Sequence, residues 1–253
     1  AVEHNSPIAF FSLEMSSVQL VKRLMISETG LSAEKIKGGK KLEEYEWEQL
    51  NMKIKSLVKA PMYIDDTPSL SVNELRSKAR KLVSLHGVKA IIIDYLQLMT
   101  GPAELRGMRE QEVSAISRSL KAIAKELNVP VIALSQLSRA VETRGGTKRP
   151  QLSDLRESGA IEQDADLVLF IHRQDYYGLS DDTQTTPGLT DIIIAKHRNG
   201  AVCDVQLRFR NSEVKFVDVT DPALNSGDSN YQNFGSIMNS DSYRSNSEFE
   251  SDF

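Results

Sequence analysis

The sequence predicts an α/β fold: a mostly parallel sheet flanked by helices, with antiparallel strands at its C-terminal edge. Over the first two thirds of the 253 residues, short apolar runs alternate with segments of helical periodicity, the pattern of parallel sheets with crossover helices. These runs are continuous rather than alternating with polar residues, as expected for strands covered on both faces. Beyond residue 165 the apolar runs follow one another closely, which favours hairpins.

The expected elements can be placed along the chain. The expected strands are residues 7–14, 61–66, 89–98, 129–136, 166–173, 190–198, 203–210 and 213–219. The expected helices start after a cap at Ser16 or Ser17, lie within 31–60, start at Ser71 or Asn73, and cover 113–127. We also expect residues 1–5 to be the end of a helix and Asn199-Gly200 to be a hairpin turn.

The apolar face of the helix at 113–127 predicts packing against the sheet. Its members recur every three or four residues: Val113, Ile116, Leu120, Ile123 and Leu127.

Composition excludes several classes of protein. With 40% hydrophobic and 26% charged residues, the chain resembles ordinary soluble domains. No apolar run approaches the ~20 residues needed to cross a membrane, and no secretory signal opens the chain, so we expect no membrane partner. The single cysteine, Cys203, excludes an internal disulfide and fits a reducing compartment. The chain begins with Ala1 rather than Met, and its first residues look like the end of a helix. We therefore expect the sequence to be a fragment of a longer protein.

The acidic residues are concentrated at the C-terminus. The net charge is −4, but residues 221–253 hold six acidic residues and one basic residue. The rest of the chain is nearly neutral, so its charge does not argue against nucleic acid binding. We expect a folded domain at 1–219 and a disordered acidic tail, rich in Ser and Asn, at 220–253.

Three predicted strands end in polar side chains: Glu14, Asp94 and Gln136. Because the carboxyl ends of parallel strands meet at one edge of a sheet, these groups predict a site for phosphoryl transfer. Glu14 could polarise an attacking water, Asp94 could hold Mg²⁺ through a water, and Gln136 could bind a terminal phosphate. The alternative is that each is a polar residue that begins a loop.

Two cations, Lys196 and Arg198, lie two residues apart on the same side of a predicted strand. They could neutralise charge on a transferred phosphoryl group, or they could be solvated cations at a strand end. The four histidines share no ligand spacing, so we expect no zinc site.

The segment 138–166 is polar and rich in glycine and in cations, which suits contact with phosphate backbones without base readout. Its cations are Arg139, Arg144, Lys148, Arg149 and Arg156. The alternative is a solvated loop. Aromatic residues are not interleaved with the cations, so base stacking is not supported.

Five segments together resemble the C-terminal motor domain of bacterial replicative DNA helicases, the DnaB family. They are FFSLEMS at 10–16, IIIDYLQL at 91–98, VIALSQLSR at 131–139, DLRESGAIEQDAD at 154–166 and KHRNG at 196–200. The resemblance covers residues 1–219. It implies a RecA-like fold, a homo-hexameric ring in the cytoplasm, ATP and Mg²⁺ bound between subunits, and 5′→3′ movement on single-stranded DNA. The family also implies primase and a helicase loader as partners.

The resemblance assigns roles to the strand-end residues. It implies that Glu14 is the catalytic glutamate, Asp94 the Walker B aspartate and Gln136 the γ-phosphate sensor. Lys196 and Arg198 would reach the site of the neighbouring subunit, with Arg198 as the arginine finger.

The resemblance implies two further sets of residues. Arg156, Glu157 and Gly159 match the central-channel loop that grips DNA phosphates, and Arg23 matches an arginine near the nucleotide.

One departure from the family pattern is serious. No part of the 253 residues matches G-x-x-x-x-G-K-[ST], the loop that cradles phosphates. In the family this loop lies upstream of the position of Ala1, and the domain that binds primase lies further upstream. We therefore expect an N-terminally truncated motor domain with little or no ATP hydrolysis of its own.

The sequence is also compatible with two other functions. One is a different RecA-like ATPase of recombination or repair. The other is a fragment that binds single-stranded DNA without hydrolysing ATP.

Overall fold

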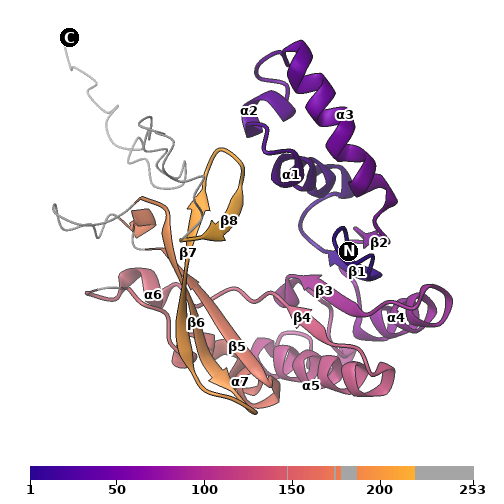
Figure 1. Ribbon diagram of the computed structural model, residues 1–253. Helices are drawn as coiled ribbons and strands as arrows, with labels where there is room; N and C mark the ends of the chain where they lie inside the picture. The colour runs from indigo at the N-terminus through magenta and orange to yellow at the C-terminus, as the bar shows by residue number, and fades with distance from the viewer. Residues whose placement is uncertain (147, 174, 178–186, 220–253) are drawn as a thin grey trace, which may run out of the picture. The chain divides into compact units, whose positions relative to one another are not determined.

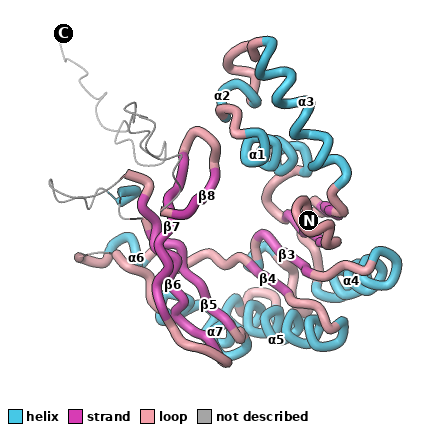
Figure 2. The backbone as a smooth tube through the Cα atoms, in the orientation of Figure 1, coloured by secondary structure: helices cyan, strands magenta, loops and turns pink. Residues whose placement is uncertain are grey.

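The computed structural model describes residues 1–146, 148–173, 175–177 and 187–219, without the side chains of 156–158 and 177. The expected disordered tail at 220–253 lies outside the described residues. Figure 1 shows the path of the chain and Figure 2 its secondary structure.

A parallel four-stranded sheet forms the first half of the fold (Figure 1). Its order is β2-β1-β3-β4, and every neighbouring pair is parallel, as the sequence predicted. The strands are β1 (Ile8–Ser12), β2 (Met62–Asp65), β3 (Ala90–Asp94) and β4 (Val131–Ala133). All four carboxyl ends therefore lie at the same edge of the sheet.

One face of this sheet is covered by α4 (Val72–His86) and α5 (Arg109–Leu127). Ser71 caps α4 by accepting a hydrogen bond from the Glu74 N–H at 3.2 Å, so the first of the two predicted starts is correct. The predicted apolar face of α5 is confirmed. Its residues lie in the main core with alternate residues of β1 and β3: Ala9, Phe11, Ile91, Ile93, Val113, Ile116, Leu120 and Ile123.

The other face of the parallel sheet is less covered. Phe10, Ile92 and Ile132 lie in register across it, and the Ile132 side chain at the β4 edge is 52% exposed.

An antiparallel sheet of order β5-β6-β7-β8 forms the C-terminal part (Figure 1). Its strands are β5 (Leu167–His172), β6 (Leu189–His197), β7 (Cys203–Arg210) and β8 (Lys215–Asp218). The predicted turn at Asn199-Gly200 joins β6 to β7.

The two sheets are not joined edge to edge. Among the described strands, β4 pairs only with β3 and β5 only with β6. The strands predicted as one edge of the parallel sheet thus form a second sheet. Between β4 and β5 the chain forms the helices α6, η3 and α7. One face of β5 stays exposed at Leu167, Leu169 and Ile171.

Three helices follow β1: α1 (Ser17–Thr29), α2 (Ala33–Ile36) and α3 (Glu44–Lys59). The Ser16 side chain accepts from the Gln19 N–H, and the Gln19 side chain accepts from the Ser16 N–H, which forms a capping box at the predicted start of α1. The single helical segment expected at 31–60 is divided in two, and a Lys35–Glu46 ion pair of 2.5 Å ties α2 to α3.

The expectation of a helix end at residues 1–5 was wrong, because residues 1–7 contain no helix.

The segment 138–166 has more structure than the predicted polar loop. It contains α6 (Ala140–Thr143), the 3₁₀ helix η3 (Leu152–Ser158) and α7 (Gly159–Asp164). Three further 3₁₀ helices are η1 (Leu96–Leu98), η2 (Ala103–Leu105) and η4 (Asp175–Tyr177). Within the described part of the chain, no helix combines the length and the apolar character needed to cross a bilayer.

The packing of α5 on the sheet predicts a large effect of truncating Ile116, which is fully buried. Ile116→Ala should lower the free energy of unfolding by about 2–5 kcal/mol, because the lost methyl groups leave a cavity. Urea denaturation measures the change. Val58→Ala on α3, where the side chain is 78% exposed, is the control and should change stability by less than about 0.5 kcal/mol. Equal effects of the two substitutions would contradict the assigned core.

Candidate functional site

The register of β1 and β3 brings Glu14 beside Asp94. Ser12 pairs with Asp94 across the ladder, and the Leu13 N–H donates to the Asp94 carbonyl oxygen at 2.7 Å. The chain then turns, with the Ser12 hydroxyl donating to the Met15 carbonyl at 2.7 Å. Glu14 is thus held at the edge where β3 ends.

The electrostatics of Asp94 indicate that charged groups converge here. Burial is the main cause that raises the pKa of its carboxyl above the usual 3.8, and the negative charge of Glu14 raises it further. The positive charge of Arg23 acts in the opposite direction. Three of the predicted residues therefore lie within electrostatic range of one another.

This raised pKa has a cost in stability. Because the folded chain holds the Asp94 proton more tightly than the unfolded chain, stability is lost as the pH rises from about 3.8 through the folded pKa. A carboxylate whose ionisation costs stability in the free protein is typical of a binding or catalytic site.

The position of Arg23 depends on how α1 is anchored. The Asp66 carboxylate, just beyond β2, accepts a hydrogen bond from the Ser17 N–H at 2.7 Å, and this bond lowers the Asp66 pKa. The first turn of α1 is therefore tied to the same edge of the sheet, and the exposed Arg23 lies along the helix.

Gln136 follows β4 at this edge. The Leu134 N–H donates to the Ile93 carbonyl and the Leu96 N–H donates to the Leu134 carbonyl, both at 2.9 Å. These bonds keep the chain after β4 beside the chain after β3. The Gln136 side chain is exposed.

Gln97 is a residue of the site that sequence reasoning missed. Its side-chain oxygen accepts from the Gln136 N–H at 3.2 Å, and its Nε2 donates to the Ser135 hydroxyl at 2.9 Å and the Gln136 carbonyl at 3.1 Å. Gln97 thus fixes the backbone that carries Gln136. The only signal in the sequence was its place three residues after Asp94, which by itself indicates no role.

The polar side chains at this edge are available to meet a ligand. Over the described ranges, the side chains of Glu14, Arg23, Asp94 and Gln136 form no hydrogen bond and no ion pair. By contrast, nearby Asp65 is paired with Lys78 at 2.8 Å. We call Glu14, Arg23, Asp94 and Gln136 the strand-end cluster.

The chemistry of the strand-end cluster fits a magnesium–nucleotide complex. Asp94 offers the hard oxygen ligand that Mg²⁺ prefers, and Mg²⁺ sites of this kind are completed by waters and phosphates. In the part of the chain that is described, no three or more His, Cys, Asp or Glu side chains lie together as a metal site would need. A cation here would therefore depend on the phosphates of its ligand.

The structure does not bring Lys196 and Arg198 to the strand-end cluster. Both lie at the end of β6 in the antiparallel sheet, where the Lys196 ammonium donates to the carbonyls of Glu162 and Gln163. Arg198 donates to the Gln163 carbonyl at 3.1 Å and pairs with Asp166 at 3.1 Å.

Two cations of the predicted basic segment serve the fold. Arg144 pairs with both carboxylate oxygens of Asp154, a residue only 4% exposed. Arg149 pairs with Asp204 on β7 at 2.5 Å. Their positive charges are therefore engaged within the chain rather than presented to a ligand.

The predicted DNA-contact residues lie where η3 meets α7. The backbones of Arg156 and Glu157 belong to η3, and their side chains lie outside the described residues. Gly159 is the exposed first residue of α7.

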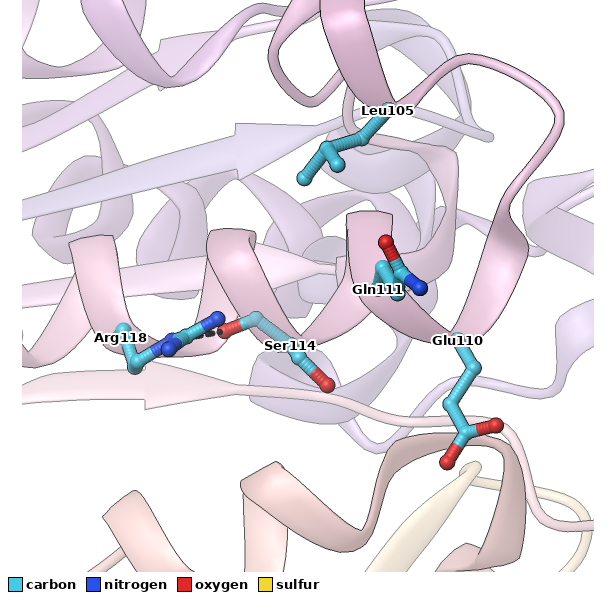
Figure 3. Close-up of a pocket in the computed structure, with 5 residues that line it drawn as sticks. All are labelled: Leu105, Glu110, Gln111, Ser114 and Arg118. Atoms are coloured by element: carbon cyan, nitrogen blue, oxygen red, sulfur yellow. Dashed lines mark hydrogen bonds between the residues drawn. The ribbon is translucent and has the colours of Figure 1, made fainter.

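A shallow depression of about 430 Å³ lies elsewhere, over η2 and the first half of α5 (Figure 3). Its lining residues are Leu105, Glu110, Gln111, Ser114 and Arg118. Arg118 donates to the Ser114 carbonyl at 3.3 Å. None of the five belongs to the strand-end cluster, so this hollow is not part of the candidate site.

The chain matches a known family over most of its length. Residues 1–218 match the family described as DnaB-like helicase C terminal domain. The chain is 51% identical over 219 residues to the replicative DNA helicase DnaB of Geobacillus stearothermophilus and 49% identical to the replicative DNA helicase DnaC of Bacillus subtilis. Each match covers 87% of this chain and 47% of the relative, so the chain spans about half the length of these curated relatives.

Solved structures agree with this assignment. A DnaB-like replicative helicase, solved in a study of its interactions with primase, gives a TM-score of 0.78 at 41% identity, covering 85% of this chain and 51% of that one. A second solved structure, an ATPase domain, superposes with a TM-score of 0.79 at 40% identity, covering 86% of this chain and 76% of that one.

The electrostatics of the strand-end cluster can be tested by titration. The Asp94 carboxyl should titrate above 3.8, as followed by ¹³C NMR of labelled aspartate. Glu14→Gln should lower this pKa because it removes a neighbouring negative charge, and Arg23→Gln should raise it because it removes a positive one. Glu48→Gln, at an exposed position on α3, is the control. An Asp94 pKa that neither substitution changes would show that the three charges do not lie together.

Proposed function

The chain belongs to the DnaB-like helicase C-terminal domain family, and we propose that it is the ATP-driven motor part of a replicative DNA helicase. The motor would move 5′→3′ on single-stranded DNA as part of a homo-hexameric ring. The single observation that carries this proposal is the strand-end cluster. Glu14, Arg23 and Asp94 lie within electrostatic range of one another, and the backbone of Gln136 is held at the same sheet edge.

Each member of the cluster suits one part of phosphoryl transfer. Bound Mg²⁺ and ATP would supply the phosphoryl group and a divalent charge beside it. Asp94 would hold the metal through a water, because Mg²⁺ keeps several waters in sites of this kind. The raised pKa of Asp94 would fall as the cation approaches, so the carboxylate would be ionised when the site is filled.

Glu14 and Gln136 would act on the attacking water and on the terminal phosphate. Glu14, exposed and adjacent, would accept a proton from the attacking water. Gln136, on the backbone that Gln97 fixes, would hydrogen-bond the terminal phosphate.

The remaining parts of such a site would come from outside this cluster. The 253 residues contain no match to G-x-x-x-x-G-K-[ST]. Lys196 lies on β6 of the antiparallel sheet, and Arg198 directly follows this strand. We propose that they act on the nucleotide of a neighbouring subunit, with Arg198 as the arginine finger, which is why the ring is part of the proposal.

The proposed DNA contact is the junction of η3 and α7. Arg156, Glu157 and Gly159 would grip the phosphates of single-stranded DNA, partly through backbone N–H groups at the exposed start of α7. Primase and a helicase loader are further proposed partners, and the similar DnaB-like helicase that was studied with primase supports the first of them. We also propose that the protein acts in the cytoplasm.

A second candidate is a fragment that binds single-stranded DNA without turnover. Another RecA-like ATPase of recombination or repair is a third. Unwinding of a forked duplex by the full-length protein distinguishes the three, because a recombinase would pair strands and an inactive fragment would only bind them.

The proposed role of Glu14 predicts a separation of binding from hydrolysis. In the full-length protein, Glu14→Gln should lower kcat for ATP hydrolysis about 10²- to 10⁴-fold, since the attacking water loses its proton acceptor. Nucleotide affinity, measured by a fluorescent ATP analogue, should stay within about threefold. Glu48→Gln is the matched control and should leave both quantities unchanged. A Glu14→Gln variant with the kcat of the unmodified protein would remove Glu14 from the mechanism.

The proposed DNA contact predicts a loss of affinity that depends on salt. In the full-length protein, Arg156→Glu should weaken binding to single strands of different sequence by a similar factor, because a phosphate contact carries no base information. The slope of log K against log salt concentration should become shallower by about 0.7 or more. Fluorescence anisotropy measures both, with Lys55→Glu on α3 as the control for charge. Unchanged affinity and slope in Arg156→Glu would refute the assignment.

A further inference from the structure

Asp166 lies where three parts of the fold meet. It follows α7, precedes β5, and is cross-strand from the end of β6, because Leu167 pairs with His197. The Arg198 N–H donates to the Asp166 carbonyl oxygen at 2.8 Å and so extends the ladder by one bond. Asp166 and Arg198 therefore face each other across the end of the two strands.

The Asp166 carboxylate bridges two cations from different elements. One oxygen pairs with Arg198 at 3.1 Å, and the other accepts from the Lys121 ammonium. Lys121 belongs to α5, which packs on the parallel sheet, whereas Arg198 follows β6 of the antiparallel sheet. The Asp166 side chain thus links α5, which packs on the parallel sheet, to Arg198 at the end of the antiparallel strand β6.

The last turn of α7 binds Lys196 and Arg198 through its backbone. The Glu162 and Gln163 carbonyls accept from Lys196, and the Gln163 carbonyl also accepts from Arg198 at 3.1 Å. Carbonyls at the end of a helix lack intrahelical donors and carry the negative end of the helix dipole, so they attract cations. The positions of both cations are therefore defined by the end of α7.

The start of the same helix is the proposed DNA contact. Gly159 begins α7, and the carbonyl acceptors lie about one helical turn further along, roughly 5 Å away. Because α7 has only six residues, its start and these acceptors belong to the same short helix.

We propose that Asp166 is a positioning residue that, with the last turn of α7, couples DNA contact at the start of α7 to the placement of Lys196 and Arg198. The inference rests on the proposed function, because it assumes that DNA binds at Gly159 and that the two cations act on a nucleotide.

The Asp166 carboxylate is ionised at neutral pH, as the bridge requires. The hydrogen bond from Lys121 is the main cause that lowers the pKa of the Asp166 carboxyl, and the positive charges of Lys121, Arg198 and Lys196 lower it further. Both of its oxygens are therefore acceptors for the two cations.

The contacts are suited to a reversible coupling. The side chains of Asp166 and Arg198 are each about half exposed, and exposed ion pairs are individually weak. Arg198 can therefore leave this network when a phosphate competes for its guanidinium group, and it can return when the phosphate departs.

The test uses Asp166→Asn in the full-length protein and measures ATP hydrolysis with and without single-stranded DNA. The ratio of the two rates should fall about 3- to 10-fold, because Arg198 loses its ion pair with Asp166 and only the Gln163 carbonyl still links it to the end of α7. DNA affinity should stay within about twofold, and Asp166→Glu should restore at least half of the lost stimulation. Lys121→Met should lower the ratio in the same direction.

The matched control is Glu126→Gln. Glu126 is also partly exposed and also pairs with two cations, Arg76 and Arg80, but these belong to α4 and not to the elements that Asp166 joins. This variant should keep the unmodified ratio.

Two results would overturn the inference. One is an Asp166→Asn protein with an unchanged ratio, and the other is an equal loss of both rates, which indicates a merely structural role. If the unmodified protein shows no DNA-stimulated hydrolysis, the proposed function fails, and the inference fails with it.

Discussion

The parallel ladder between β1 and β3 is the interaction on which the rest of the site depends. Its register sets Ser12 against Asp94, and the next bond, from the Leu13 N–H to the Asp94 carbonyl, carries the ladder to the position of Glu14. A shift by one residue would turn every side chain of β1 to the other face of the sheet. The core residues Ala9 and Phe11 oppose such a shift, because they would leave the core.

Much of the fold could be predicted from the sequence because its signals are local. Continuous apolar runs marked the parallel strands, serine caps marked the starts of α1 and α4, and helical spacing marked the buried face of α5. The separation of the two sheets could not be predicted. Local sequence does not show whether β4 and β5 will pair, and in the structure they belong to different sheets.

The residues of the candidate site were likewise predicted only in part from the sequence. Glu14, Asp94 and Gln136 were predicted because each follows or ends a strand, and parallel strands share an edge. Gln97 and Asp166 were missed as positioning groups, because their bonds to Ser135 and Lys121 span 38 and 45 residues of sequence. A different error concerns Arg144, which looked like a phosphate ligand by composition. The buried Asp154 engages it, and burial is not visible in a charge pattern.

The central claim is that the ends of β1, β3 and β4 form one nucleotide site. The most direct measurement is a crystal structure of the full-length protein with Mg²⁺ and a non-hydrolysable ATP analogue. We predict the metal within one water of Asp94, with Glu14 and Gln136 facing the terminal phosphate. A nucleotide bound elsewhere, with these three side chains still free, would contradict the account.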